Sequence, residues 1–205
     1  MITHSYIVTA LESYSVCNRQ IRWLAEILPD NWELVFVDDG SNPPIEIPEV
    51  RPKFSHIIRT GDTRPWTQGV ARNVAALYAC GKYFLMTDID HFFTRQTIDA
   101  CDSFAGKMLM FERAAGNITE DLELIKLGIP VHAKHPNTFL ISRELWDRTD
   151  GYRTEDAGAY RPIDTPFLRK CEELLGGDIP THHGARIYVI PEEVETFHGL
   201  SRRPK

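Results

Sequence analysis

The chain has 205 residues, of which 42% are hydrophobic and 25% charged, so it has room for one compact domain with a sizeable core. Its formal net charge of -6 disfavours a sequence-independent nucleic-acid binder, which usually presents a basic face. No apolar run approaches the ~20 residues that cross a bilayer, and the first residues are typical of a strand rather than of a signal peptide. We therefore expect a cytoplasmic protein without a transmembrane segment.

The cysteines are far apart in the sequence. They stand at Cys17, Cys80, Cys101 and Cys171. Because no CxxC pair exists, neither a local structural zinc site nor a redox pair is predicted. We expect free thiols in a reducing compartment.

The first ninety residues alternate between strand and helix patterns. β-Branched and aromatic composition predicts strands at residues 5–10, 33–37, 56–59 and 83–87. Helical spacing of apolar residues predicts two helices between them, one marked by Cys17, Ile21, Leu24 and Leu28, the other by Val70, Val74 and Leu77. This order predicts an α/β fold, with a mainly parallel central sheet and helices on both faces.

The rest of the chain is less regular. A helix is predicted over residues 94–104 and a strand over 107–111. Residues 112–136 mix glycine, histidine and charge, so we expect a mobile loop there, with a short helix at 121–126. A strand over 137–142, a helix over 143–149, a helix around Phe167 and Cys171, and a strand over 186–190 complete the expected order. No segment resembles a linker, so residues 1–205 are treated as a single domain.

Acidic residues follow two of the predicted strands, at the edge of a parallel sheet where ligands collect. Asp88 and Asp90 are two apart on an extended segment, so their carboxylates point the same way and repel unless a cation lies between them. Mn²⁺ and Mg²⁺ prefer such oxygen ligands and share them with substrate phosphates. The alternative is a solvated acidic pair at a strand end.

Two further motifs are weak by themselves. Asp38 and Asp39 precede Gly40 and Ser41, which is ordinary turn chemistry, but one carboxylate could also accept hydrogen bonds from a nucleobase or ribose. Arg72 stands near the start of the second predicted helix, where it would add to an end that already favours anions. Pairing of Arg72 with an acidic side chain is the alternative.

Taken together and in this order, VFVDDGS, GVARN and FLMTDID resemble the nucleotide-binding half of family-2-like GT-A glycosyltransferases. The segment GYRTEDAGAYRPIDTPFLRK, residues 151–170, resembles the acceptor-side motif of galactosyltransferase-like members. The resemblance implies a GT-A fold with a nucleotide-binding half at about 1–91 and an acceptor-side half at about 92–205. It also implies a hexosyltransferase that uses a UDP-sugar and Mn²⁺ or Mg²⁺, with inversion. The loop at 112–136 would then order over the donor.

Carried over by position, the resemblance implies roles for individual residues. The nucleotide-sugar would be bound by Thr9, Asp38, Asp39, Arg72 and Asp88. The metal would be held by Asp88, Asp90 and His198. Asp164 would be the general base that deprotonates the acceptor hydroxyl, although an aspartate before Thr165 and Pro166 is also a favoured helix N-cap.

The sequence departs from the family at two places. Ile163 stands where the family has a glutamate, and Thr9-Ala10-Leu11-Glu12 replaces the common motif of the first strand. An inactive nucleotide-sugar-binding protein is therefore an alternative. A sugar nucleotidyltransferase is less favoured, because no glycine-rich basic segment follows the first strand. The acceptor is left open between a glycan, a lipid-linked sugar, a protein and a modified DNA base.

Overall fold

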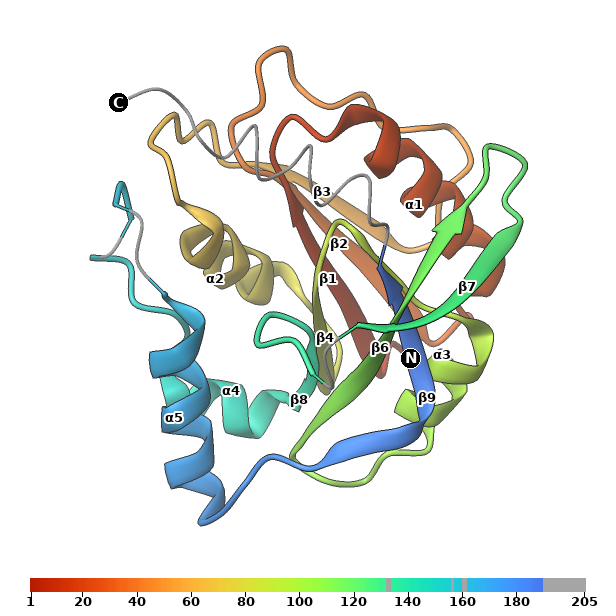
Figure 1. Ribbon diagram of the computed structural model, residues 1–205. Helices are drawn as coiled ribbons and strands as arrows, with labels where there is room; N and C mark the ends of the chain where they lie inside the picture. The colour runs from red at the N-terminus through yellow and green to blue at the C-terminus, as the bar shows by residue number, and fades with distance from the viewer. Residues whose placement is uncertain (132–133, 156, 160–161, 190–205) are drawn as a thin grey trace.

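The computed structural model describes residues 1–131, 134–155, 157–159 and 162–189 (Figure 1). The strands are β1 (His4–Ala10), β2 (Trp32–Asp38), β3 (Ser55–Arg59), β4 (Tyr83–Asp88), β5 (His91–Phe92), β6 (Met108–Ile118), β7 (Leu124–Val131), β8 (Phe139–Ser142) and β9 (Thr181–Val189). The helices are α1 (Tyr14–Ile27), α2 (Gln68–Tyr78), α3 (Arg95–Asp102), α4 (Arg143–Thr149) and α5 (Asp164–Leu175). The strands form one sheet in the order β3-β2-β1-β4-β8-β6-β9-β5, with β7 paired to β6.

The two halves of this sheet differ in strand direction. β1 pairs in parallel with β2 and β4, and β2 pairs in parallel with β3. Beyond β4 the sheet is mixed, because β8 runs antiparallel to both β4 and β6 while β9 runs parallel to β6. The α/β fold with a central sheet is confirmed, and its parallel part is the half that carries the acidic motifs.

Helices cover both faces of the sheet, as expected. In Figure 1, α1 and α3 lie to the right of the sheet, and α2, α4 and α5 lie to the left. The apolar stripe of α1 is buried at Cys17, Ile21 and Leu24, which share one core cluster with α3. The other cluster joins α2, α4 and α5 to the opposite face. The apolar residues whose helical spacing predicted α1 thus form the face of the helix that packs on the sheet.

The second helix is correctly predicted, but its buried face is not the expected one. Leu77 is 84% exposed, and Val70 and Val74 are only partly buried. The buried positions are small or polar, namely Gly69, Ala71, Arg72, Ala75 and Ala76. Small side chains let α2 approach β1 and β2 closely, and they leave room for one long side chain beneath the helix.

The expected mobile loop at residues 112–136 with a helix at 121–126 is wrong for the described residues. β6 continues to Ile118, and β7 returns antiparallel beside it. The tight turn between them is closed by the Thr119 amide, which donates to the Glu123 carbonyl, and Leu122 takes a positive φ of 63° there. Ile118 is buried in the first core cluster, so apolar burial stabilises the hairpin.

All four cysteines are free, with Cys80 exposed and the other three buried. Among the described residues, no helix combines the length and the apolar character that a membrane crossing requires.

Candidate functional site

The carboxyl ends of β1, β2 and β4 bring the sequence motifs together at one edge of the sheet. Thr9, near the end of β1, is in register with Val37 of β2 on one side and with Asp88 of β4 on the other. Thr9 is buried, and the acidic pair Asp38 and Asp39 lies one strand away. The sheet topology therefore gathers four of the predicted binding residues at the crevice where ligands bind in such folds.

Asp38 organises the loop that follows β2. Its Oδ1 accepts the backbone amide of Ser41 and its Oδ2 that of Ile45, each at 2.9 Å. Gly40 between them has φ of 85°, and a Cβ there would collide with the carbonyl oxygen of Asp62. The turn chemistry expected for this motif is therefore present, and both oxygens of the buried Asp38 are used by it.

Asp39 is held by hydroxyl groups instead of amides. Its Oδ2 accepts from the Thr67 hydroxyl at 2.7 Å and its Oδ1 from the Thr60 hydroxyl at 3.2 Å. Burial raises the pKa of Asp39, and the threonine hydrogen bonds oppose that shift. Hydroxyl donors at these distances fix the carboxylate toward the start of α2.

Arg72 lies beneath α2 as a buried cation. Its side chain is 1% exposed and donates to Asp88 Oδ1 at 2.8 Å, to the Tyr152 hydroxyl at 2.9 Å and to the Asn137 carbonyl at 3.0 Å. Pairing with an acid, the alternative considered for Arg72, is thus observed, although the pair is buried rather than solvated. Loss of one of these acceptors would destabilise the fold, because it would leave the buried guanidinium charge incompletely compensated.

Asp88 stays ionised because of its neighbours. The same Oδ1 also accepts from the Gln68 amide at 2.7 Å, and Oδ2 lies 3.5 Å from Nδ1 of His135. Burial acts to raise the pKa of Asp88, but Arg72 and then the histidines outweigh it, so the pKa is below its ordinary value. A carboxylate charged at neutral pH is therefore kept at the end of β4.

A set of possible metal ligands surrounds Asp88. One donor atom each from Asp88, His91 and His135 lies within 4.8 Å of the other two. Burial lowers the pKa of His91 to about 3 and also lowers that of His135, so both imidazoles are neutral near pH 7 and able to coordinate a cation. Carboxylate with imidazole suits Mn²⁺, so these residues fit a divalent ion.

Of the other predicted ligands, Asp90 lies in the turn after β4, and among the described residues it is not a member of this three-residue set. His198 lies outside the described residues. The structure therefore offers histidine ligands that were not predicted for the metal, from within β5 and from the segment before β8.

Asp164, at the start of α5, is an electrostatic neighbour of Arg72 and Asp88. It is the first residue of the helix, not its N-cap; the N-cap is Ile163, which gives no side-chain cap. The side-chain amide of Asn137 lies against the Asp164 carboxylate. With its nitrogen oriented toward the carboxylate, Asn137 donates a hydrogen bond to Asp164 Oδ2 at 2.8 Å. Burial, reinforced by Asp88 and opposed by Arg72, raises the pKa of Asp164 to about 6.

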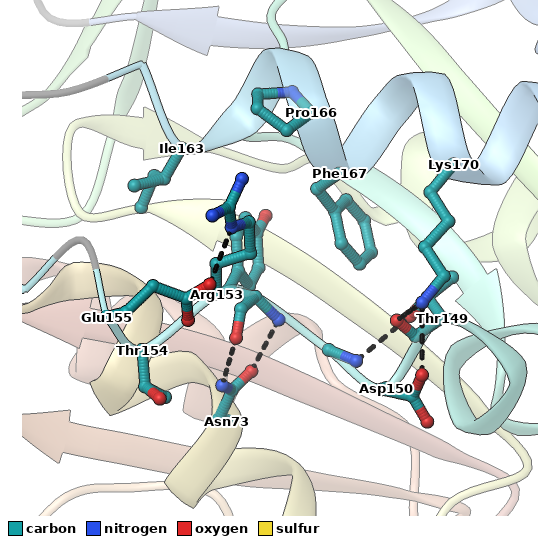
Figure 2. A pocket seen from close by; sticks show the side chains of 12 residues that line it. Asn73, Thr149, Asp150, Arg153, Thr154, Glu155, Ile163, Pro166, Phe167 and Lys170 are labelled. Atoms are coloured by element: carbon teal, nitrogen blue, oxygen red, sulfur yellow. Dashed lines mark hydrogen bonds and ion pairs between the residues drawn. The ribbon is translucent and has the colours of Figure 1, made fainter.

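A cleft of about 400 Å³ opens between α2, the end of α4 and the first turns of α5 (Figure 2). Its lining residues are Asn73, Thr149, Asp150, Gly151, Tyr152, Arg153, Thr154, Glu155, Ile163, Pro166, Phe167 and Lys170. The Tyr152 ring stacks on Phe167 with 4.5 Å between centroids, while its hydroxyl accepts from Arg72. Tyr152 thereby links the cleft, which the predicted acceptor-side motif lines, to the Arg72–Asp88 pair.

Sequence reasoning missed the residues that hold the acidic groups in place. Gln68 stands four residues before Arg72 and so on the same side of α2, a spacing that would have indicated it. His91 directly follows the acidic motif, a position that would have indicated it. Asn137 and Tyr152 carry no local signal, because their partner Arg72 is distant in the sequence.

Known glycosyltransferases resemble this chain in sequence and in fold. The family model of glycosyl transferase family 2 matches residues 5–101. The solved structure of S. aureus TarS 1-349 is similar with a TM-score of 0.64 and 18% identity, covering 98% of this chain and 64% of that one. Its complex with UDP-GlcNAc gives a TM-score of 0.67 and 17% identity, covering 92% of this chain and 58% of that one.

The mannosyltransferase PcManGT from Pyrobaculum calidifontis, in complex with GDP-Man and Mn²⁺, gives a TM-score of 0.66 and 15% identity, with 97% of this chain and 60% of that one covered. This chain thus spans less than two thirds of these structures. No curated protein matches it significantly. The chain has the GT-A fold, as the motifs implied, and its residues 5–101 match the sequence model of glycosyl transferase family 2.

Proposed function

We propose that this protein is an inverting, metal-dependent glycosyltransferase of the hexosyltransferase type, which moves a sugar from a UDP-sugar to an acceptor hydroxyl. The observation that carries the proposal is a desolvated carboxyl, Asp164, beside the Arg72–Asp88 pair at the carboxyl edge of the sheet. The family 2 sequence and the glycosyltransferases among the similar structures support the reaction class.

The donor is assigned to the crevice above β1, β2 and β4. Thr9, Asp38 and Asp39 would face the nucleoside. The hydroxyls of Thr67 and Thr60 support that role for Asp39 by orienting its carboxylate, whereas Asp38 orders the loop after β2. A nucleotide-sugar donor is supported by the UDP-GlcNAc and GDP-Man that the two similar structures contain. UDP is proposed as the nucleotide because the sequence motifs imply it and the TarS complexes contain UDP-GlcNAc and UDP.

Asp88 and Asp90 would hold Mn²⁺ or Mg²⁺, with His91, His135 or His198 as imidazole candidates. When bound, such an ion supplies neutralisation of charge on the departing diphosphate. The contribution of the chain itself is to keep Asp88 ionised. Arg72 does so by pairing with it at 2.8 Å in a site from which water is largely excluded.

Asp164 is proposed as the general base. It would take the proton of the acceptor hydroxyl while that oxygen forms a bond to the anomeric carbon and the bond from that carbon to the diphosphate breaks on the opposite side. A pKa of about 6 leaves Asp164 ionised at pH 7 to 8 yet close enough to that pH to accept a proton efficiently. Attack from the side opposite the leaving group inverts the anomeric configuration.

The acceptor is assigned to the cleft of Figure 2, which begins one residue from Asp164 at Ile163. Its volume of about 400 Å³ is in the range of small-molecule sites. The apolar Ile163 replaces a hydrogen-bonding glutamate of the family. This replacement favours a second candidate function, an inactive protein that binds the nucleotide-sugar without transfer.

One experiment separates the two. The protein is incubated with UDP- and GDP-sugars and Mn²⁺, and the released nucleoside diphosphate is measured for the wild type, Asp164→Asn and Asp178→Asn. Asp178 is an exposed carboxyl just beyond the same helix and serves as the matched control. Release that disappears only in Asp164→Asn supports the transferase. Donor binding by the wild type without any release favours the inactive protein.

A further inference from the structure

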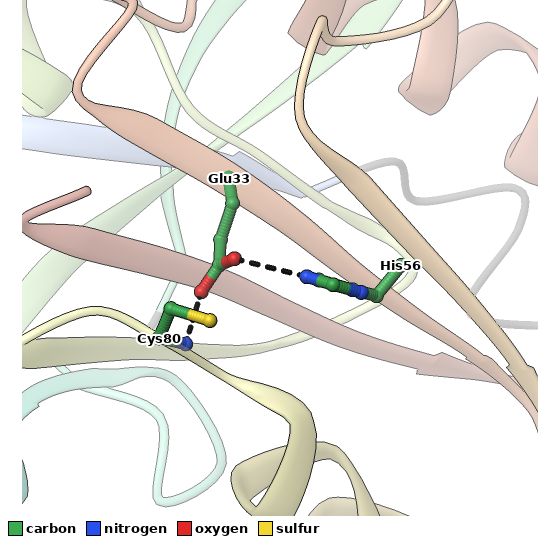
Figure 3. A group of neighbouring side chains, drawn as sticks. All are labelled: Glu33, His56 and Cys80. Atoms are coloured by element: carbon green, nitrogen blue, oxygen red, sulfur yellow. Dashed lines mark hydrogen bonds and ion pairs between the residues drawn. The ribbon is translucent and has the colours of Figure 1, made fainter. Parts of the chain in front are cut away.

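A second cluster of possible ligands lies at the opposite edge of the sheet, away from the site described above. Glu33 is near the start of β2, His56 is in β3, and Cys80 is between α2 and β4. One ligand atom from each lies within 4.8 Å of the other two, and all three side chains converge in Figure 3. A carboxylate, an imidazole and a thiol, from distant parts of the sequence, are thus brought together by the strand order β3-β2-β1-β4.

The centre of the cluster is the buried carboxylate of Glu33, whose side chain is 2% exposed. Its Oε1 accepts from the Ser5 hydroxyl at 2.6 Å and from the backbone amides of Cys80 and Gly81. Its Oε2 lies 3.3 Å from Nε2 of His56, which is the ion-pair partner of Glu33 within the described part of the chain. Oε1 of Glu33 is therefore saturated by neutral donors, while Oε2 faces the imidazole of His56.

The other two groups are open to solvent. The His56 side chain is 43% exposed, and Cys80 is the exposed cysteine of the four. A cation can therefore reach the buried carboxylate from outside, between an imidazole and a thiol. Among the described residues, Glu33 has no lysine or arginine partner in an ion pair. A bound cation would therefore stabilise its buried carboxylate, because the cation offsets the cost of desolvation.

We propose that Glu33, His56 and Cys80 form a zinc-binding site. Thiolate, imidazole and carboxylate are the three zinc ligands found in proteins, and Zn²⁺ accepts three of them with water in the fourth position. Tetrahedral zinc bonds place ligand atoms roughly 3.3–3.8 Å apart. The ligand atoms of Glu33, His56 and Cys80 lie within 4.8 Å of one another, so a displacement of about 1 Å by the two exposed side chains brings them to zinc-binding distances. On binding, the Cys80 thiol gives its proton to solvent, His56 binds as neutral imidazole and releases to solvent any proton it carries in the pair with Glu33, and Glu33 binds as carboxylate.

Bound zinc would cross-link the edge strand β3, through His56, and the connection after α2, through Cys80, to the start of β2 at Glu33. Glu33 and Asp38 stand at opposite ends of β2, roughly 17 Å apart at strand spacing, so the zinc would not touch the donor site. The competing explanation is that Glu33 is only a structural anchor for Ser5 and the loop at Cys80. That explanation requires no affinity for metal.

Cobalt titration tests the proposal, because Co²⁺ bound to a thiolate gives a charge-transfer band in the near ultraviolet. The metal-free protein is first saturated with Mn²⁺ to fill oxygen sites, then titrated with Co²⁺, then with Zn²⁺. We expect a band at one equivalent of Co²⁺, its loss when Zn²⁺ displaces Co²⁺, and a zinc-dependent rise in melting temperature. Cys80→Ser should abolish the band and the rise, and His56→Gln should weaken Co²⁺ binding at least tenfold.

The variants are chosen to remain folded, since each replaces a side chain that is at least partly exposed. His183→Gln is the control, because it removes an exposed imidazole on β9 that pairs with Glu112 instead. It should leave the titration unchanged. The proposal is overturned by the absence of the band in the wild type, by a band that persists in Cys80→Ser, or by unchanged affinity in His56→Gln.

Discussion

Replacing Asp164 by asparagine should make the protein more stable and less active at the same time. The fold raises the pKa of this carboxyl from 3.8 to about 6, chiefly by burial. Between these two values the folded state holds the proton more tightly than the unfolded state, so stability falls as pH rises and is lowest above pH 6. Two pKa units correspond to about 3 kcal/mol, which Asp164→Asn should recover at pH 8.

The assay is urea denaturation of the wild type and Asp164→Asn at pH 5 and pH 8. Linkage gives an advantage for the variant that is about 1.4 kcal/mol larger at pH 8 than at pH 5. Asp178→Asn, which removes an exposed carboxyl, should show no such change. Transferase activity should fall about 10²- to 10⁴-fold in Asp164→Asn, and that of the wild type should fall tenfold per pH unit below pH 6.

Two results would refute this reasoning. If Asp164→Asn is less stable than the wild type at pH 8, the carboxylate is a structural partner of Asn137 and not a desolvated group held for chemistry. If the stability advantage does not grow with pH, Asp164 titrates as an ordinary surface acid. In either case the argument for Asp164 as the base loses its physical support.

Arg72→Met should cost about 3–5 kcal/mol in urea denaturation, because it leaves a carboxylate buried without its cation, and a loss below 1 kcal/mol would contradict the burial. Gly151→Ala should destabilise by about 1–3 kcal/mol more than Gly176→Ala: both glycines have φ of 73°, but only at Gly151 does a Cβ meet another group, Asn73 Oδ1 at 2.5 Å. Asp90→Ala should weaken Mn²⁺-assisted UDP binding in calorimetry at least tenfold, and unchanged affinity would remove Asp90 from the proposed metal site.

The sequence predicts the parallel half of the fold well, because strong local patterns coincide there with burial. β1 and β2 are buried along their whole length, and β4 is buried except at its two ends, since both faces of the sheet are covered. α1 repeats its apolar residues every three to four positions. α2 is the exception. Its buried face is made of Ala71 and Ala75, which have no strong hydrophobic signal, so the larger Leu77 wrongly suggested the opposite face.

The β6–β7 hairpin was missed for a related reason. A register shift between Ala114 and Gly116 interrupts the alternation that would identify β6 beyond residue 111. In the site, the carboxylates were predictable because they directly follow apolar strands. Their partners were not, since Arg72 binds Asn137 and Tyr152 across 65 and 80 residues of sequence.

Those long-range contacts of Arg72 mean that the candidate site cannot be assembled from the family-matched segment alone. Residues 5–101 contain the arginine and its carboxylate on β4, but two of its three acceptors come from the rest of the chain. The same segment would leave β4 without β8, its antiparallel neighbour. A truncated protein ending at residue 101 would therefore have both an unpaired strand edge on β4 and an arginine that lacks two of its three acceptors, so the site is complete only when the sheet is complete.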